Sequence, residues 1–307
     1  MDAAAMADAS TLTGVPPVQE PGRDRPRGPF SKTLPTLLGV PVLAWQLVFF
    51  AGPLLFLIVV TFWRVQSFRL EPAFSLDNWE RILGAATFYK ALLHTLQAAA
   101  TTTVLALLIA FPAAYTIALR LQPRLRDLAI ALLVIPVFSS YMLRIYAWQI
   151  VLSPMGIANS LLGALGIEAL PLLGGAFSLQ VGLLTLTLPS AVLVLSFALS
   201  GVDPSLVEAA ENLGCRRLQV VGHVLLPAVR PALVLAGSTT FLLAFGDYVS
   251  SLFMTGSNPP TLSILIVDTV KSGSQWPRAS VIGVCMLALL GLVFLLGRRL
   301  ASTRRSA

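Results

Sequence analysis

Six long apolar runs constrain the fold of this chain more than any other feature of its sequence. They lie near residues 38–62, 92–119, 128–151, 178–200, 232–254 and 279–297. The hydrocarbon layer of a bilayer is about 30 Å thick, which about 20 helical residues can cross. A segment inside that layer must satisfy its backbone hydrogen bonds internally, so each run is expected to be a helix. The sequence therefore predicts an all-α, polytopic membrane protein with six transmembrane helices.

The composition excludes an ordinary cytosolic enzyme. Of the 307 residues, 11% are charged and 56% are hydrophobic, whereas average soluble domains carry roughly 25% charged residues. The net charge of +7 does not indicate nucleic-acid binding, because the basic residues cluster between apolar runs rather than along one face. Two cysteines and two histidines are too few for a disulfide framework or a metal site.

The distribution of basic residues predicts the orientation of the chain. With both termini inside, 14 of the 21 lysines and arginines lie on the cytoplasmic side, six lie in outer loops and Arg144 lies within the third run. This bias favours a topology with both termini inside. Residues 1–36 are expected to form a disordered cytoplasmic tail, residues 37–300 the membrane domain and residues 301–307 a second cytoplasmic tail. No signal-peptide pattern follows Met1, so no cleaved signal is expected.

Two outer loops are long enough to hold structure of their own. In the loop 63–91, apolar residues recur at helical spacing after Asp77, which predicts a short interfacial helix leading into the second span. The loop 152–177 is apolar but broken by Gly and Pro. We expect it to be a re-entrant or surface-hugging loop and not a seventh crossing.

The cytoplasmic loop 201–231 carries the strongest local signals. Asp203 can cap a helix N-terminus, Pro204 suits the first helical position, and Gly214 suits the left-handed residue after the helix end. A helix of about ten residues is therefore expected, followed by a second helical stretch from Arg216 to Leu226. The apolar face of the first helix is predicted to carry Leu206, Ala210 and Leu213, with Ala209 beside them.

This loop resembles a known motif. It reads Glu208-Ala209-Ala210, then three intervening residues and Gly214, then nine intervening residues and Val224-Leu225-Leu226-Pro227. This pattern is similar to the EAA loop of binding-protein-dependent ABC importer permeases. The departure is Val224, where that family has Ile. The resemblance implies the MetI-like fold of type I importers and a coupling helix that docks in a cleft of an ATP-hydrolysing subunit. The implied coupling residues are Leu206, Glu208, Ala209, Ala210, Leu213, Gly214, Leu226 and Pro227, with Glu208 as the anchor.

The chain also resembles the spermidine/putrescine-type branch of these permeases, in residues 139–148 and 245–249. The resemblance implies that a polyamine or a related amine passes through the protein. The candidate pathway residues are Tyr141, Arg144, Tyr146, Trp148, Asp247 and Tyr248. Charged residues at membrane depth usually face a bundle interior or water. Asp247 is thus either an anionic station for a cationic solute, with aromatic rings beside it, or a structural residue. In the structural alternative it pairs with Arg144, or both lie near the lipid headgroups with aromatic anchors.

The resemblance also implies the partners of the chain: two copies of an ABC ATPase, a paralogous permease and a periplasmic solute-binding protein, in a bacterial inner membrane. No Gly precedes any of the three lysines, so a phosphate-binding loop of the Gly-Lys-Ser/Thr type is absent from the sequence. We therefore expect no cofactor and no metal on this chain, and ATP with Mg²⁺ on the ATPase. The alternatives are an ion-gradient-driven secondary transporter, which would predict more acidic residues within the spans, and an intramembrane enzyme.

Overall fold

The computed structural model describes residues 41–66 and 69–302, with side chains up to Leu296. The predicted N-terminal tail and residues 303–307 lie outside these ranges. The chain divides into two compact units after Leu55. Residues 41–55 of the first unit are helical and include a π-helical turn, η1, at Leu47–Ala51.

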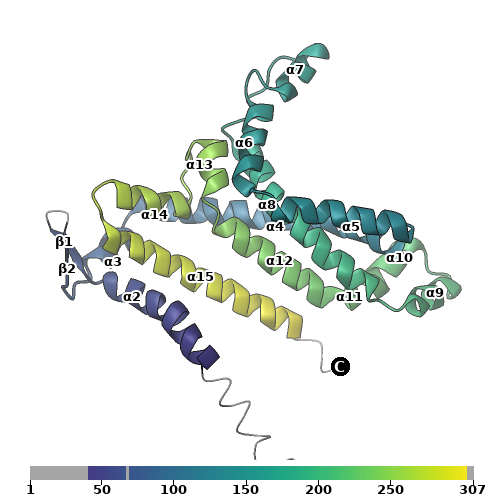
Figure 1. Ribbon diagram of the computed structural model, residues 1–307, viewed down its shortest axis with the longest axis horizontal. Coiled ribbons are helices and arrows are strands. Elements are labelled where there is room, and N and C mark those ends of the chain that lie inside the picture. Colours follow the sequence, from purple (N-terminus) through teal and green to yellow (C-terminus); the bar gives the residue numbers. More distant parts are fainter. Residues whose placement is uncertain (1–40, 67–68, 303–307) are drawn as a thin grey trace, which may run out of the picture. The chain divides into compact units, whose positions relative to one another are not determined.

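The described part of the chain is mostly helical, as the apolar runs predict (Figure 1). After η1, its elements are α2 Gly52–Val60, β1 Arg64–Gln66, β2 Arg69–Glu71, α3 Asp77–Leu83, α4 Ala86–Leu119, α5 Pro123–Phe138, α6 Tyr141–Leu152, α7 Ile157–Ala164, α8 Ala176–Ser200, α9 Pro204–Asn212, α10 Arg217–Val220, η2 Val221–Leu225, α11 Leu226–Ala228, α12 Arg230–Phe245, α13 Val249–Thr255, α14 Leu262–Lys271 and α15 Trp276–Ser302. β1 and β2 form an antiparallel hairpin that the sequence analysis did not predict.

Within the described residues, five helices are long and apolar enough to cross a membrane, or six if one bent pair counts as a single span. The five are Pro41–Val60, Ala86–Leu119, Tyr141–Ala164, Ala176–Ser200 and Trp276–Leu296, and the bent pair is Arg217–Ala228 with Arg230–Phe245. Four of the predicted spans, the first, second, fourth and sixth, are therefore confirmed within a few residues.

The third predicted span is not one helix. α5 ends at Phe138 because Ser139 adopts an extended backbone conformation, and α6 begins at Tyr141. The segment that is long enough to cross the membrane runs from Tyr141 through α7 to Ala164. The predicted boundaries 128–151 were therefore wrong, and the predicted loop 152–177 contains the helix α7.

The fifth predicted span is broken as well. α12 ends at Phe245, and the chain restarts as α13 at Val249. On its other side, α12 is bent by 74° from the helical stretch 217–228. A single helix over 232–254 was therefore wrong. The physical cause of the second break is local: the Asp247 side chain accepts a hydrogen bond from the backbone N–H of Ser250 at 2.8 Å and so begins a new helix.

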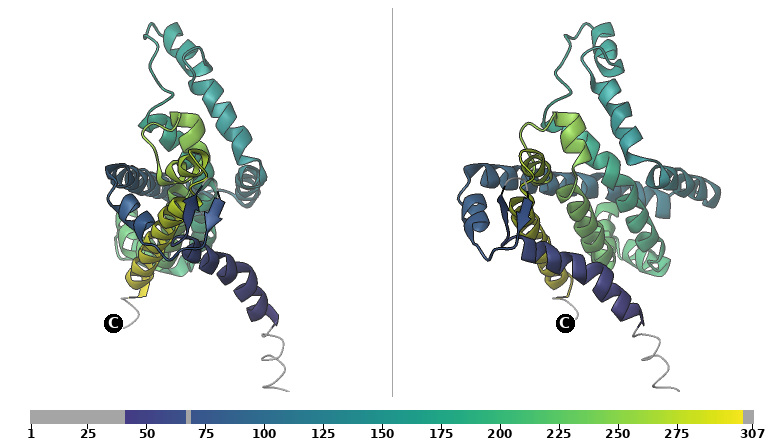
Figure 2. Two further views of the ribbon diagram at one scale, coloured as in Figure 1. Left: turned by 90° about the vertical axis from the view of Figure 1, so that its left-hand side faces the viewer. Right: turned by 60° about the vertical axis from the view of Figure 1, so that its left-hand side comes forward.

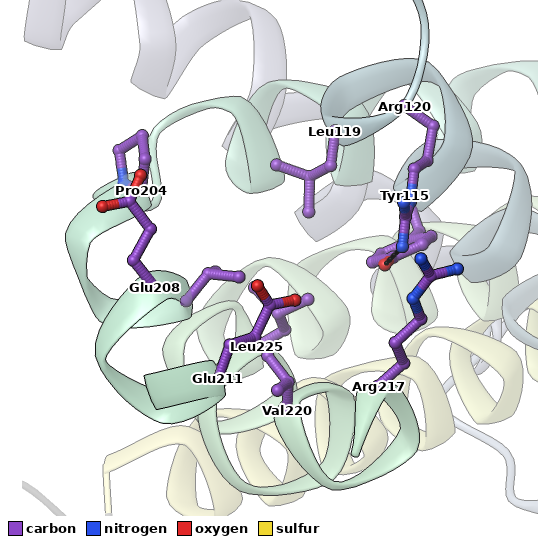
Figure 3. Close-up of a pocket in the computed structure, with 10 residues that line it drawn as sticks. Tyr115, Leu119, Arg120, Pro204, Glu208, Glu211, Arg217, Val220 and Leu225 are labelled. Carbon is purple, nitrogen blue, oxygen red and sulfur yellow. Dashed lines mark hydrogen bonds between the residues drawn. The ribbon is translucent and has the colours of Figure 1, made fainter. Parts of the chain in front are cut away.

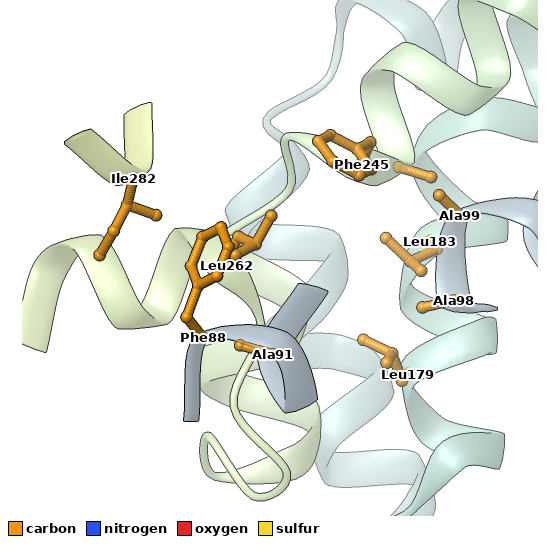
Figure 4. Packing of buried hydrophobic residues seen from close by; sticks show 10 residues of the cluster. Phe88, Ala91, Ala98, Ala99, Leu179, Leu183, Phe245, Leu262 and Ile282 are labelled. Atoms are coloured by element: carbon orange, nitrogen blue, oxygen red, sulfur yellow. The ribbon is translucent and has the colours of Figure 1, made fainter. Parts of the chain in front are cut away.

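Close packing of α4, α8 and α12 forms the core of the second unit. The buried face of α4 consists largely of alanines, which let neighbouring helices approach closely. One buried cluster joins α4, α8, α12, α14 and α15 through residues that include Phe88, Leu183, Phe245 and Ile282 (Figure 4). A second cluster joins α4 and α8 to Leu225, Val229 and Ala236, and Val207 of α9 packs against it. The loop 201–231 is thus anchored directly to the transmembrane core.

The two loops that the topology places on opposite sides of the membrane lie at opposite ends of the second unit. The β1–β2 hairpin and α3 contact the first part of α15, and α9 lies at the far end of α12 (Figures 1 and 2). α3 confirms the short helix expected after Asp77. This arrangement is the one that an outer loop and a cytoplasmic loop require.

Candidate functional site

Local residues fix both ends of helix α9. The Asp203 carboxylate accepts a hydrogen bond from the N–H of Ser205 at 2.9 Å, and this bond lowers the pKa of Asp203. Pro204 is the first helical residue. At the other end Gly214 has a φ of +82°, as predicted. The Asp203 cap and the Gly214 turn are both confirmed.

The C-terminal end of α9 is a complete Schellman motif. The N–H of Cys215 bonds the carbonyl of Ala210 at 3.1 Å, and the N–H of Gly214 bonds the carbonyl of Glu211 at 2.9 Å. These are the two bonds by which a left-handed residue closes a helix end. α9 is therefore a short rigid element whose boundaries do not depend on a partner.

The two adjacent alanines of α9 differ in their exposure. Ala210 is 8% exposed, and it faces inward together with Val207, which packs on the core. Ala209 is exposed, as are Leu206 at 51% and Leu213 at 85%. The prediction that Ala210 shares the open face with Leu206 and Leu213 was therefore wrong. The apolar face that is open to a partner consists of Leu206, Ala209 and Leu213, which we call the docking face.

The second helical stretch of the loop is confirmed, with one irregularity. The Gln219 side chain accepts the N–H of Arg216 at 2.7 Å and so starts the helix. The stretch then passes through the π-turn η2 just before Pro227, and the N–H of Leu226 bonds the carbonyl of Val221. Because a proline has no N–H, the normal helical ladder is interrupted at this point in any case. Leu226 and Pro227 remain exposed at the surface.

A groove of about 260 Å³ separates α9 from the end of α4 and the start of α10 (Figure 3). Glu208 and Glu211 line it on the α9 side, and Arg120 and Arg217 line it on the other. The Arg120 guanidinium donates a hydrogen bond to the Tyr115 hydroxyl at 3.1 Å and lies 5.7 Å from the centre of its ring. Glu208 thus faces a groove with charges of both signs.

Sequence reasoning missed most of this groove. Tyr115, Arg120, Glu211 and Arg217 all line it, but none belongs to the EAA pattern. The spacing of Glu208 and Glu211, three residues apart, could have shown that both acids lie on one face of α9. The arginines carry no comparable signal, because the fold alone brings them opposite those acids.

A second polar cluster joins α6 to the break between α12 and α13. The hydroxyl groups of Tyr141 and Ser250 are hydrogen-bonded, and the N–H of Ser250 donates to Asp247. The Arg144 guanidinium lies 5.7 Å from the centre of the Tyr141 ring and donates to the carbonyl of Thr185 at 2.6 Å. Asp247 is 8% exposed. Arg144 and Asp247 form no ion pair within residues 41–66 and 69–302, so the predicted structural pairing is not what holds them.

The structure brings only three of the six predicted pathway residues together, namely Tyr141, Arg144 and Asp247. Tyr146 instead packs on Phe253, with ring centroids 5.0 Å apart. Trp148 lines an apolar pocket of about 400 Å³ together with Arg144. Tyr248 is half-buried at the start of α13.

The comparisons with known proteins agree with the fold and with the loop. Residues 120–306 match the family model described as binding-protein-dependent transport system inner membrane component. The chain is 27% identical over 260 residues to the spermidine/putrescine transport system permease protein PotB of Salmonella typhimurium (strain SL1344), which covers 84% of this chain and 90% of that protein. It is 30% identical over 292 residues to a candidate 2-aminoethylphosphonate transport system permease protein, PhnU, of Salmonella typhimurium (strain LT2), covering 87% and 94%.

Among solved structures, the chain resembles a bacterial ABC transporter involved in the import of the acidic polysaccharide alginate. The TM-score is 0.67 at 19% identity, and the match covers 87% of this chain and 96% of that chain. This likeness confirms the all-α, MetI-like permease fold. A family model that covers residues 120–306 establishes membership on its own, and the chain belongs to the family of binding-protein-dependent ABC importer permeases, non-catalytic membrane components of the bacterial inner membrane.

Proposed function

We propose that α9 is the coupling helix of this permease and that its docking face, Leu206, Ala209 and Leu213, seats in a cleft of an ABC ATPase. The observation that carries the proposal is that α9 is capped at both ends, packed against the core through Val207, and apolar on its exposed side. A rigid rod of this kind transmits rigid-body motion to the helices on which it rests. Glu208 anchors the partner at the edge of the groove.

The proposed assembly joins this chain to three other kinds of component. Two copies of the ATPase bind ATP with Mg²⁺, a paralogous permease completes the pore, and a periplasmic binding protein delivers the solute. Family membership supports an ATPase, a second permease and a binding protein. The alginate importer has been crystallised with its periplasmic protein bound to an alginate pentasaccharide. The copy number and the heterodimeric pairing are part of the proposal.

The coupling role is tested with Glu208→Lys and Gly214→Trp in the complete importer, reconstituted in liposomes. Both variants are expected to abolish solute uptake, while ATP hydrolysis no longer responds to the loaded binding protein. Glu208→Gln, which keeps the shape and the oxygen acceptor, serves as the matched control and should retain most of the uptake. Normal uptake by a stably inserted Gly214→Trp protein would refute the docking role of α9.

The proposed solute is a small amine of the polyamine class. The chain has 27% identity to spermidine/putrescine permeases, and it places a buried carboxylate, Asp247, beside the Tyr141 hydroxyl group. A carboxylate at this depth can neutralise a passing ammonium group, and an aromatic ring can add cation–π attraction. Asp247 also begins α13, so the same residue would link the solute path to the shape of the broken helix.

The presence of Arg144 in the same cluster favours a second candidate. A guanidinium and a carboxylate that share Tyr141 without pairing fit a zwitterionic amine that carries both charges. Uptake of radiolabelled putrescine and of 2-aminoethylphosphonate by the reconstituted importer would separate the two candidates.

Asp247→Asn is the decisive variant for the polyamine assignment. The amide oxygen can still accept the N–H of Ser250, so α13 is preserved while the charge is lost. A charged hydrogen bond is worth about 1.5–3 kcal/mol, so uptake of a polyamine should fall by at least about tenfold with assembly intact. Equal uptake by Asp247→Asn and the parent protein would exclude the cation station.

A further inference from the structure

A pocket of about 280 Å³ lies at the opposite end of the second unit from α9. It is formed by β1, α3 and the start of α15. Three arginines line it, Arg64, Arg81 and Arg278, against a single acid, Asp77; the other polar side chains include Gln66 and Gln275. The pocket therefore carries an excess of positive charge.

The one acid in the pocket, Asp77, already forms an ion pair. The Arg64 guanidinium donates to the Asp77 carboxylate at 2.7 Å and to the Ser75 hydroxyl at 3.1 Å. This contact is an ion pair that ties β1 to the start of α3. Arg81 and Arg278 consequently have no acidic partner in the described part of the chain, and the Nε atom of Arg278 is buried without a hydrogen-bond acceptor. The two unpaired positive charges favour an anion from outside, which can reach the exposed Arg81 and the half-buried Arg278.

Tryptophans place this pocket at the membrane surface. Trp63 lies just after the end of α2, Trp79 belongs to α3, and Trp276 begins α15. Tryptophan rings concentrate at the level of lipid headgroups, where one side of the ring is apolar and the other is wet. α15 is itself a candidate span from Trp276 to Leu296. The arginines therefore lie where a bilayer carries its phosphates.

We propose that this pocket binds the phosphate of an anionic phospholipid headgroup, with Arg81 and Arg278 as its ligands. Guanidinium groups suit this role because their fixed donor geometry matches two phosphate oxygens at once. The net positive charge of the pocket favours a headgroup with net negative charge, such as phosphatidylglycerol, over zwitterionic phosphatidylcholine. With both termini inside, the lipid belongs to the outer leaflet. The Arg64–Asp77 pair then fixes the hairpin at the rim.

The test uses the complete importer, purified in detergent and analysed by native mass spectrometry while phosphatidylglycerol or phosphatidylcholine is added. Phosphatidylglycerol should bind the parent protein at least tenfold more tightly than phosphatidylcholine. Arg81→Gln and Arg278→Gln should each weaken phosphatidylglycerol binding by about tenfold, and Arg278→Lys by less. Arg69→Gln is the matched control, since Arg69 is an exposed arginine of the same hairpin that does not line the pocket. It should leave binding within twofold of the parent.

The melting temperature of each variant shows whether weaker lipid binding comes from a folding defect. Without anionic lipid, Arg278→Gln relieves repulsion between the two arginines and should melt at or above the parent temperature. With phosphatidylglycerol present, the parent and Arg69→Gln should both be stabilised further, and Arg278→Gln should be stabilised less than either.

Three results would overturn the proposal. The first is equal binding of the two lipids by the parent protein. The second is displacement of phosphatidylglycerol by millimolar inorganic phosphate, which would indicate a site for the free anion. The third is a loss of affinity for the binding protein in Arg278→Gln while lipid binding is unchanged, which would indicate a protein-docking surface. None of these measurements involves ATP or solute, so their outcome is separate from that of the coupling proposal.

Discussion

The adjacent alanines of the EAA sequence allow a sharp test of which face of α9 meets the ATPase. Leucine at either position adds the same three carbons in opposite surroundings. Ala210 is 8% exposed, so Ala210→Leu must crowd the residues that cover it, which typically costs about 1–3 kcal/mol. Ala209 is exposed, so Ala209→Leu should change the stability of the free permease by no more than about 0.5 kcal/mol.

Binding of the ATPase should show the reverse order. Ala209→Leu places extra volume in a closely packed interface, and a similar cost of about 1–3 kcal/mol corresponds to about 5- to 150-fold weaker binding. The assay strips the ATPase from inner-membrane vesicles and measures its rebinding, alongside the melting temperature of the detergent-purified complex. If Ala210→Leu weakened rebinding without lowering the melting temperature, and Ala209→Leu did neither, the assignment of the two faces would be wrong.

Three further predictions concern other parts of the described structure. Gly214→Ala should weaken the end of α9 by about 1–2 kcal/mol, because its φ of +82° is strained for any residue with a Cβ; faster amide exchange near Gly214 would report this, and unchanged exchange would contradict it. Gly182→Ala should destabilise the contact between α8 and α13 by about 1–3 kcal/mol, since the added carbon would lie 2.8 Å from the Ser250 hydroxyl oxygen; a normal melting temperature would count against it. The Ser75 hydroxyl and the Arg64 guanidinium lower the pKa of Asp77 below its usual 3.8. The stability that these two contacts contribute is therefore complete above pH 3.8, and it is lost as the pH falls through the lower pKa of the folded state. Proteolysis of the hairpin should rise only in acid, and Asp77→Asn should remove this pH dependence.

Much of the coupling loop could be predicted because its signals are local. An Asp-Pro start and a glycine at a left-handed position act through bonds within a few residues, so the structure repeats the predicted α9 almost without change. The short helix after Asp77 was predicted for the same reason. The choice between Ala209 and Ala210 could not be made in this way, because the surface on which α9 rests comes from distant helices.

The broken spans show a different limit. Hydropathy reports how apolar a run is but not where its backbone turns, so the runs 128–151 and 232–254 looked continuous. The breaks depend on single groups, the extended backbone of Ser139 and the carboxylate of Asp247. The sequence predicts that this carboxylate is a binding station or an ion-pair partner, and the structure shows in addition that it accepts a backbone hydrogen bond at the start of α13.

The sequence by itself determined that this chain is a membrane protein, that it is helical, and that a capped helix lies between the fourth and fifth apolar runs. These properties follow from chain-local physics, namely transfer of apolar residues out of water and the closing of backbone hydrogen bonds. Only the tertiary structure decided which face of α9 is free, that Arg144 and Asp247 share Tyr141 without pairing, and that Arg81 and Arg278 meet in one pocket. Those relations join residues far apart in the chain, and only the packing of the whole bundle sets their distances.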